Sequence, residues 1–258
     1  MSIYWVLPVK ERLSSTIFFM VRLPRWFSFS VVLALLAGCQ PLSPEEQSRL
    51  RGEAPPATSS ELSSTADARS GFEAPRNPIG IEGFRDEFDR VQLGENWRED
   101  GRPFSIVAGK LFTRETGNRG LWLRRALPRD VRIEFTVRAE GNAADIKVEL
   151  FGDGESFQPT SGYIVIFGGW SNSANVIARL NENDAGRAIG PPRSVKAGKT
   201  YQMRIERRGT VIEAFVDGVL LARLDDPAPL EGPGHQFFAF NGWQSELWYD
   251  DLVITPLS

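Results

Sequence analysis

From Phe84 to the end of the chain, apolar and polar residues alternate with a period of two. The pattern is clearest over residues 131–138, and residues 146–150 and 201–206 repeat it. Successive side chains of a strand point to opposite faces, so each segment predicts a strand with one face in a core and the other in water. No segment after Phe84 has sustained helical periodicity. We therefore expect an all-β region.

Turn signals separate these segments and set the size of the fold. Asp217-Gly218 lies between two apolar runs, residues 211–216 and 219–224, which predicts a two-residue β-hairpin. Roughly a dozen short strands over about 175 residues fit one antiparallel two-sheet β-sandwich or jelly roll. We place this domain at residues 81–258.

Two of the expected strands, residues 162–167 and 236–240, are apolar on both faces. A strand that is covered on both sides lies in the middle of a sheet, with its second face under another layer or lining a groove. Each of these strands runs directly into a glycine-containing loop that carries a tryptophan, Trp170 in the first and Trp243 in the second.

The segment before Cys39 has the features of an export signal. Residues 20–25 are basic, and residues 26–37 form an apolar run that is too short for a stable spanning helix. The tetrad Leu36-Ala37-Gly38-Cys39 resembles the bacterial lipobox. That resemblance implies removal of residues 1–38 and acylation of Cys39, and several acyl chains make a durable membrane anchor. The alternative is an ordinary signal peptide with an incidental cysteine.

Two details refine the export signal. Met20 is a second candidate for the start of translation, because residues 1–19 lengthen the basic region unusually. Gln40 follows the cysteine, which resembles the pattern of lipoproteins that are sorted to the outer membrane. We therefore expect a lipid-anchored protein of the cell envelope, at the outer membrane.

Residues 39–80 link the lipidated cysteine to the domain. They carry Ser, Glu, Ala, Thr and Pro with few large apolar side chains, so they cannot bury enough surface to fold. We interpret them as a flexible tether.

Composition excludes several kinds of chemistry. The chain has one Cys and one His, so a zinc site or Cys–His catalysis within the domain is excluded once lipid takes the thiol. Its 30 basic and 33 acidic residues give no sign of a nucleic-acid surface. We expect a monomer.

The two ends of the domain resemble the first and last strands of concanavalin A-like lectin/glucanase domains. The opening is Phe84-Arg-Asp-Glu-Phe88 followed by Asn96-Trp97, and the close includes Trp248-Tyr-Asp-Asp251-Leu-Val-Ile254. The resemblance implies a curved jelly-roll sandwich whose concave face usually meets carbohydrate. The superfamily includes lectins, carbohydrate-binding modules, glycoside hydrolases, polysaccharide lyases and adhesion modules.

Carbohydrate binding is the function that we expect first. Sugar rings stack their C–H faces on exposed indoles, while amides and arginines read the hydroxyl groups. The candidate residues are Trp170, Asn172, Arg179, Asn241, Trp243 and Gln244. The alternative is that both tryptophans close the end of the core. We expect Trp97, Trp122 and Trp248 to be core residues.

Two other functions stay open. A glycoside hydrolase generally needs two carboxylates at the scissile bond, and the Glu-x-Asp-x-x-Glu motif of the retaining glucanases is absent. Glu134 and Glu149 would form a catalytic pair if their strands were neighbours; otherwise they belong to solvated faces. A hydrolase or lyase is thus the second reading, and a structural or adhesion module that binds protein is the third.

A structural Ca²⁺ often lies at the paired terminal strands of this superfamily. The first expected strand offers Asp86 and Asp89, and the last offers Asp250 and Asp251. Hard oxygen ligands of this kind suit Ca²⁺. The resemblance therefore implies a candidate calcium site at these four carboxylates.

Overall fold

The computed structural model describes residues 78–99, 103–155 and 160–258, and the statements below concern these residues. The signal peptide (residues 1–38), Cys39 and residues 40–77 of the tether lie outside them. No helix in the described part of the chain is long and apolar enough to cross a membrane.

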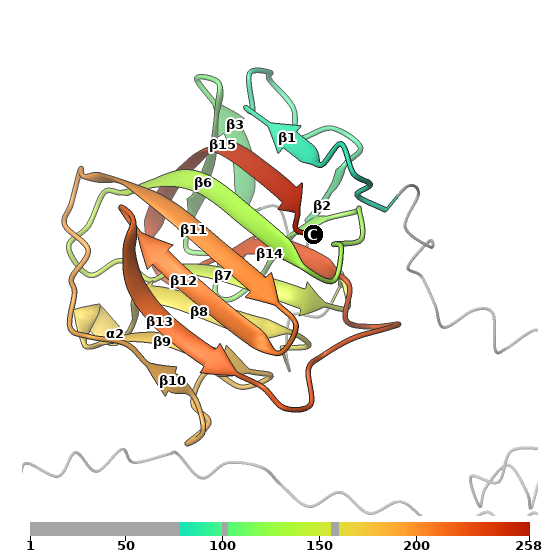
Figure 1. Ribbon diagram of the computed structural model, residues 1–258. Coiled ribbons are helices and arrows are strands. Elements are labelled where there is room, and N and C mark those ends of the chain that lie inside the picture. Colours follow the sequence, from blue (N-terminus) through green and yellow to red (C-terminus); the bar gives the residue numbers. More distant parts are fainter. Residues whose placement is uncertain (1–77, 100–102, 156–159) are drawn as a thin grey trace, which may run out of the picture. The chain divides into compact units, whose positions relative to one another are not determined.

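The described residues form two antiparallel sheets packed face to face (Figure 1), which confirms the predicted all-β sandwich. Sheet A contains, in order, β13 (Val219–Asp225), β12 (Val211–Val216), β11 (Thr200–Arg208), β6 (Val131–Ala139), β15 (Glu246–Pro256), β4 (Lys110–Arg114) and β3 (Phe104–Val107), with β1 (Phe84–Asp86) paired to β15. Sheet B contains β10 (Ala188–Ile189), β9 (Ala174–Arg179), β8 (Tyr163–Gly168), β7 (Ile146–Gly152), β14 (Phe237–Asn241), β5 (Leu121–Leu123) and β2 (Trp97–Glu99). A short turn of helix, α2 (Gly169–Asn172), follows β8.

The core lies between the sheets and is rich in aromatic rings. Alternate residues of β6 are buried, as its period-two pattern predicts. Phe240 of sheet B meets Phe135 of sheet A edge-on, with ring centroids 5.3 Å apart, and its ring lies 4.5 Å from that of Tyr249. Such ring pairs add stabilisation of about 0.5–1.5 kcal/mol beyond the area that they bury.

The central strands of sheet B are buried on both faces. Every residue of β7, β8 and β14 is buried, which confirms the prediction for residues 162–167 and 236–240. The interpretation of β7 as a half-solvated strand is wrong, because Lys147 is 2% exposed and Glu149 is 1% exposed. Polar groups of neighbouring loops contact both side chains, Glu182 on Lys147 and Ser161 on Glu149. The outer face of sheet B is therefore covered at this strand.

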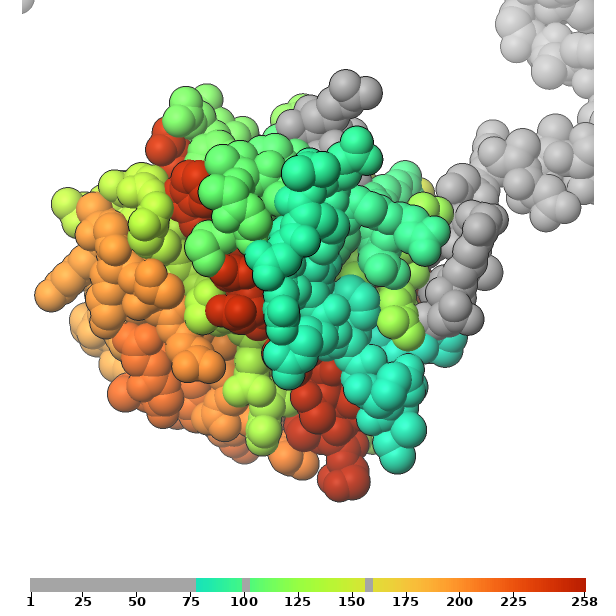
Figure 2. Space-filling model, turned by 90° about the horizontal axis from the view of Figure 1, so that it is seen from above, coloured from blue at the N-terminus to red at the C-terminus, as the bar shows by residue number. Residues whose placement is uncertain are grey.

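The first and last strands lie side by side, as the resemblance implied. β1 pairs with β15, with Phe84 opposite Ile254. Figure 2 shows the blue-green residues of the N-terminal part lying against the red residues of the C-terminal strand. Ile79, which we assigned to the tether, is 5% exposed and its N–H donates to Ala126 O at 3.0 Å. The packed domain thus begins before residue 81.

The predicted hairpin joins β12 to β13. Asp217 and Gly218 both have positive φ, 49° and 76°. A two-residue turn that matches the right-handed twist of its strands requires positive φ at both positions, which Asp-Gly tolerates.

Candidate functional site

Loops at one end of sheet B surround a cavity of about 510 Å³. They follow β8 and β14, precede β7 and connect β4 to β5. The loop between β9 and β10 leaves β9 at the opposite end of the sheet and also contributes to the lining, through Glu182. The lining residues are Asn118, Ala143, Asp145, Trp170, Ser171, Glu182, Trp243, Gln244 and Ser245. We call this cavity the indole pocket, because both candidate tryptophans line it.

The two indoles are exposed and do not close the core. Trp170 is 40% exposed and Trp243 is 44% exposed. Trp170 lies in α2, where it and Ser171 have left-handed backbone angles, φ 49° and 58°. Such angles are costly for residues with a side chain and persist where the surroundings impose them. Because both side chains are this exposed, the alternative that the two tryptophans close the end of the core is wrong.

A buried lysine lies beneath the indole pocket. The Nζ of Lys147 donates to Asn118 Oδ1 at 2.7 Å and to Glu182 Oε2 at 2.5 Å, and it lies 3.7 Å from Asp145 Oδ2. This single ammonium group joins three loops. It also compensates the two carboxylates that line the pocket, since a buried charge is stable only when it is paired.

Asp145 is the least satisfied polar group of the pocket. Its Oδ1 atom is buried and has no hydrogen-bond partner, while its backbone N–H donates to Ser245 Oγ at 3.0 Å. Burial raises the pKa of Asp145, although the nearby Lys147 ammonium lowers it in part. Asp145 thus lines the pocket with one oxygen near Lys147 and the other, Oδ1, without a donor.

Of the three amide side chains among the candidate residues, one lines the pocket and two hold the loops around it. Gln244 lines the pocket. Asn241 is 2% exposed; its Nδ2 donates to Asn118 O at 3.1 Å and its Oδ1 accepts from the Gly242 N–H at 2.7 Å. The Oδ1 of Asn172 accepts from the Val195 N–H at 2.7 Å. These two asparagines hold the loops and do not line the pocket.

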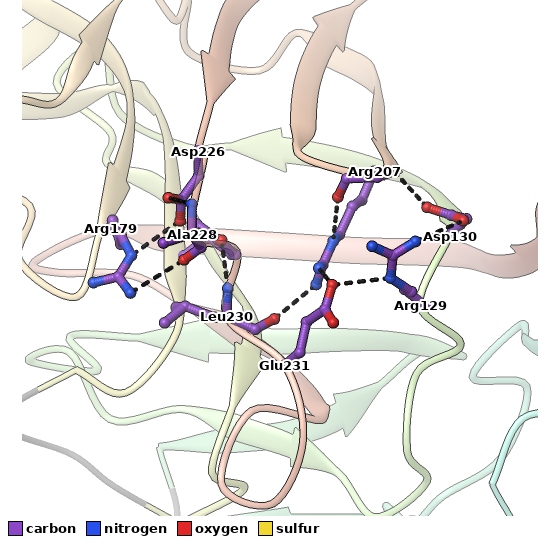
Figure 3. A network of polar contacts seen from close by, with 10 residues as sticks. Arg129, Asp130, Arg179, Arg207, Asp226, Ala228, Leu230 and Glu231 are labelled. Atoms are coloured by element: carbon purple, nitrogen blue, oxygen red, sulfur yellow. Dashed lines mark hydrogen bonds and ion pairs between the residues drawn. The ribbon is translucent and has the colours of Figure 1, made fainter.

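Arg179 lies away from the pocket, so its assignment to the sugar site is wrong. It is the last residue of β9, where it lies opposite Tyr163 at the start of β8, and it is not among the lining residues of the pocket. Its Nε donates to Asp226 Oδ2 at 2.9 Å and its Nη2 to Ala228 O at 3.5 Å (Figure 3). Arg207, which is 2% exposed, holds the same segment through Leu230 O at 2.9 Å and Glu231 at 2.8 Å. These arginines fix the segment between β13 and β14.

The proposed catalytic pair is also wrong, because its members lie in different sheets. β6 pairs with β11 and β15, and Glu134 stands opposite Arg204 on sheet A. Glu149 lies on β7 of sheet B, where its Oε1 accepts from the backbone N–H groups of Ser161 at 2.9 Å and Gly162 at 2.8 Å. Burial raises its pKa to about 7.

The candidate calcium ligands do not converge. The carboxylate of Asp86 accepts from Phe88 N–H at 2.9 Å, Trp97 Nε1 at 2.8 Å and Arg90 Nη2 at 2.8 Å, so donors surround it. Asp250 pairs with Lys110. Within the described ranges, no group of three His, Cys, Asp or Glu side chains lies close enough together to hold a metal ion. Asp89 and Asp251 therefore do not belong to such a group either. The terminal strands pair as expected, but the described carboxylates at them do not gather into a metal site.

The expectation for the other tryptophans is correct for two of three. Trp97 and Trp122 are buried. Trp248 lies on the outer face of sheet A, where its ring is 4.5 Å from Phe112 and 5.6 Å from the Arg138 guanidinium. Its strand alternates as predicted, but the strand presents this residue to the outer face.

Sequence reasoning missed Asn118, Asp145, Lys147 and Glu182. One signal was available, a lysine at the second position of a strand, between the apolar residues Ile146 and Val148. The other three residues lie in loops whose convergence depends on strand order, which local sequence patterns do not encode.

No protein-family model matches the sequence, and no curated protein matches it. Solved structures do resemble the domain. The carbohydrate-binding module CBM66 from Bacillus subtilis has a TM-score of 0.50 and 12% identity, over 64% of this chain and 98% of that chain. A structure described with endo-acting O-glycanases of the human gut microbiota, which initiate mucin breakdown, has a TM-score of 0.51 and 15% identity, over 68% and 99%. A putative glycosyl hydrolase from Parabacteroides distasonis has a TM-score of 0.51 and 10% identity, over 69% and 95%. These likenesses show a shared β-sandwich fold.

Proposed function

We propose that the domain binds carbohydrate in the indole pocket. The observation that carries the proposal is the pair of exposed indoles, Trp170 and Trp243, above a floor of fixed polar groups. The similar folds include a carbohydrate-binding module and a putative glycosyl hydrolase, which agrees with this function.

The pocket has the two components that sugar recognition needs. Indole faces supply a large contact area for C–H groups at a small cost in side-chain entropy. The amides of Asn118 and Gln244 and the carboxyl groups of Asp145 and Glu182 offer hydrogen-bond donors and acceptors for hydroxyl groups. Because Lys147 and Asn241 hold this wall through hydrogen bonds, little ordering is needed on binding.

A glycan array on the full chain in detergent tests the proposal, with Trp170→Ala and Trp243→Ala beside it. Loss of a stacking indole should weaken binding at least about tenfold, which corresponds to about 1.4 kcal/mol. Trp248→Phe is the matched control, since it removes an indole from the other sheet. Unchanged binding in both pocket variants would refute the site.

Hydrolysis is the second candidate function, and one observation favours it. Asp145 and Glu182 both line the pocket and both lie near the Lys147 ammonium, so two carboxyl groups meet in one cavity. Glycosidases use two carboxyl groups about 5–10 Å apart. Incubation of the domain with a glycan that it binds, followed by mass spectrometry of the products, separates the functions. Intact glycan supports a binding module alone.

We also propose that Cys39 is lipidated and anchors the protein to the outer membrane. The proposal rests on the lipobox-like tetrad and on Gln40. Metabolic labelling with a fatty-acid analogue, followed by membrane fractionation, tests it. The wild-type chain should carry label in the outer-membrane fraction, and Cys39→Ala should lose the label. Label that persists in this variant would overturn the assignment.

A further inference from the structure

A second hollow of about 390 Å³ adjoins the indole pocket. The two share Ala143, Gln244 and Ser245 in their walls. Because Gln244 and Ser245 border both hollows, a ligand that stacks on the indoles has room to continue beyond them. The site therefore suits an oligomer and not only a single ring.

The joined hollows are acidic. Glu140 and Glu246 line the second hollow, and Asp145 and Glu182 line the first. No lysine, arginine or histidine is among the lining residues of either hollow in the part of the chain that the structure describes. A ligand in this site thus meets carboxylates in the walls, and the nearest basic group to the indoles is Arg187, over the Trp170 ring.

Three of the four carboxylates already have a cationic partner. Glu140 pairs with Arg138 at 2.6 Å, Glu246 pairs with Arg114, and Glu182 pairs with Lys147 at 2.5 Å. Asp145 has only the 3.7 Å contact with the same lysine, and its Oδ1 is without a partner. Asp145 is therefore the carboxyl group of the site with the weakest cationic pairing, and a positively charged donor would pair with it best.

We propose that the ligand is an oligomer of amino sugars with free amino groups, and that Asp145 selects the ammonium. The proposal rests on the proposed function, because it assigns the ligand class of the same pocket. An ammonium donates to the carboxylate and is also attracted to indole faces. Arg187 shows that attraction in this site, since its guanidinium lies 5.0 Å from the centre of the Trp170 ring.

The same chemistry excludes acidic sugars. A uronate brings a carboxylate, which accepts hydrogen bonds but donates none, towards Asp145 and Glu182. Lys147 does not compensate it, because its ammonium is buried and is already shared by Asn118, Glu182 and Asp145. An N-acetylated sugar keeps the ring and loses the charge, so it should bind less tightly than the free amine.

Titration calorimetry at mildly acidic pH tests this, with three probes. They are a glucosamine hexamer, its fully N-acetylated counterpart and a galacturonate hexamer. The wild-type chain should prefer the free amine over the acetylated chain by about tenfold, and it should not bind the uronate measurably. This preference should shrink as salt is added, because it is electrostatic.

Asp145→Asn should bind the two glucosamine-based probes about equally, because the amide keeps the shape and removes the charge. Glu213→Gln on β12 of sheet A is the control and should keep the wild-type preference. Equal or tighter binding of the acetylated hexamer by the wild type, or a preference that salt does not change, overturns the amino-sugar assignment. Carbohydrate binding in the indole pocket would still stand in that case, since it fails only if the Trp170→Ala and Trp243→Ala variants bind glycans as the wild type does.

Discussion

Lys147 and Glu182 are joined by a 2.5 Å contact between Nζ and Oε2 across 35 residues of sequence. The lysine is 2% exposed and the glutamate side chain 23%. The pair connects a central strand of sheet B to the loop after β9, and it lies beneath the indole pocket. This contact holds a wall residue of the pocket, Glu182, to a strand of the sheet. A change at the contact should therefore affect both the stability of the domain and binding in the pocket.

Replacement of Lys147 by Met should destabilise the domain by about 1–3 kcal/mol, because it leaves Glu182, Asn118 and Asp145 without their donor. Urea unfolding measures the change. Lys199→Met is the matched control: Lys199 pairs with Asp217 at the surface, where an ion pair contributes about 0–1 kcal/mol. If the two variants lost equal amounts of unfolding free energy, Lys147 would stabilise the domain no more than a surface lysine does.

Glu149 should make the domain less stable as the pH rises from about 4.5 to about 7. Burial raises its pKa in the folded chain, so over this range the folded state holds a proton that the unfolded state has lost. The unfolding free energy therefore falls with pH, by up to about 3 kcal/mol. Glu149→Gln should flatten this decline while Oε1 keeps accepting from Ser161 and Gly162.

Urea unfolding at several pH values measures the effect of Glu149. Glu134→Gln, on the outer face of sheet A, is the control and should leave the profile unchanged. A decline of the same size in wild type and Glu149→Gln would assign the pH dependence to other groups.

Asp86 should stabilise the domain without a metal ion. Burial alone would raise its pKa, but hydrogen bonds from Arg90, Trp97 and Phe88 outweigh burial and lower it. Its contribution is present above the pKa of the unfolded chain and is lost as the pH falls through the lower folded value. Asp86→Asn should cost about 2–3 kcal/mol at neutral pH, because the amide presents a donor to these donors.

A thermal melt with and without EDTA separates the hydrogen-bond explanation from a calcium site. The melting midpoint should be the same in both conditions for the wild-type chain. A midpoint that falls with EDTA and recovers with added Ca²⁺ would contradict this prediction.

Tyr163→Phe should destabilise the segment between β13 and β14. The Tyr163 hydroxyl donates to Asp226 Oδ2 at 2.7 Å and accepts from the Leu230 N–H at 2.8 Å. Its removal leaves a buried N–H without a partner, at a cost of about 1–3 kcal/mol. Arg179→Met removes a part-exposed partner of the same Asp226 and should cost less, about 0–1 kcal/mol. Urea unfolding of both variants tests this order, and the reverse order would contradict it.

The sequence by itself determined the strands and the local geometry of the turns. The alternation of β6 predicted which residues are buried, because the direction of a side chain in a strand follows from its position alone. Asp217-Gly218 predicted the hairpin for a similarly local reason, the positive φ that both positions adopt. The two doubly apolar segments identified the central strands that run into the loops carrying Trp170 and Trp243.

Only the tertiary structure decided which strands are neighbours and which loops meet. Glu134 and Glu149 alternate correctly in their strands, yet the strands belong to different sheets. Arg179 and Trp170 are close in sequence, but β9 carries them to opposite ends of sheet B. The alternation of its strand predicts that Lys147 faces water, but the loop that carries Glu182 covers it in the structure. Strand pairing and loop contacts depend on the packing of the whole chain, whereas periodicity reports only the faces of each strand.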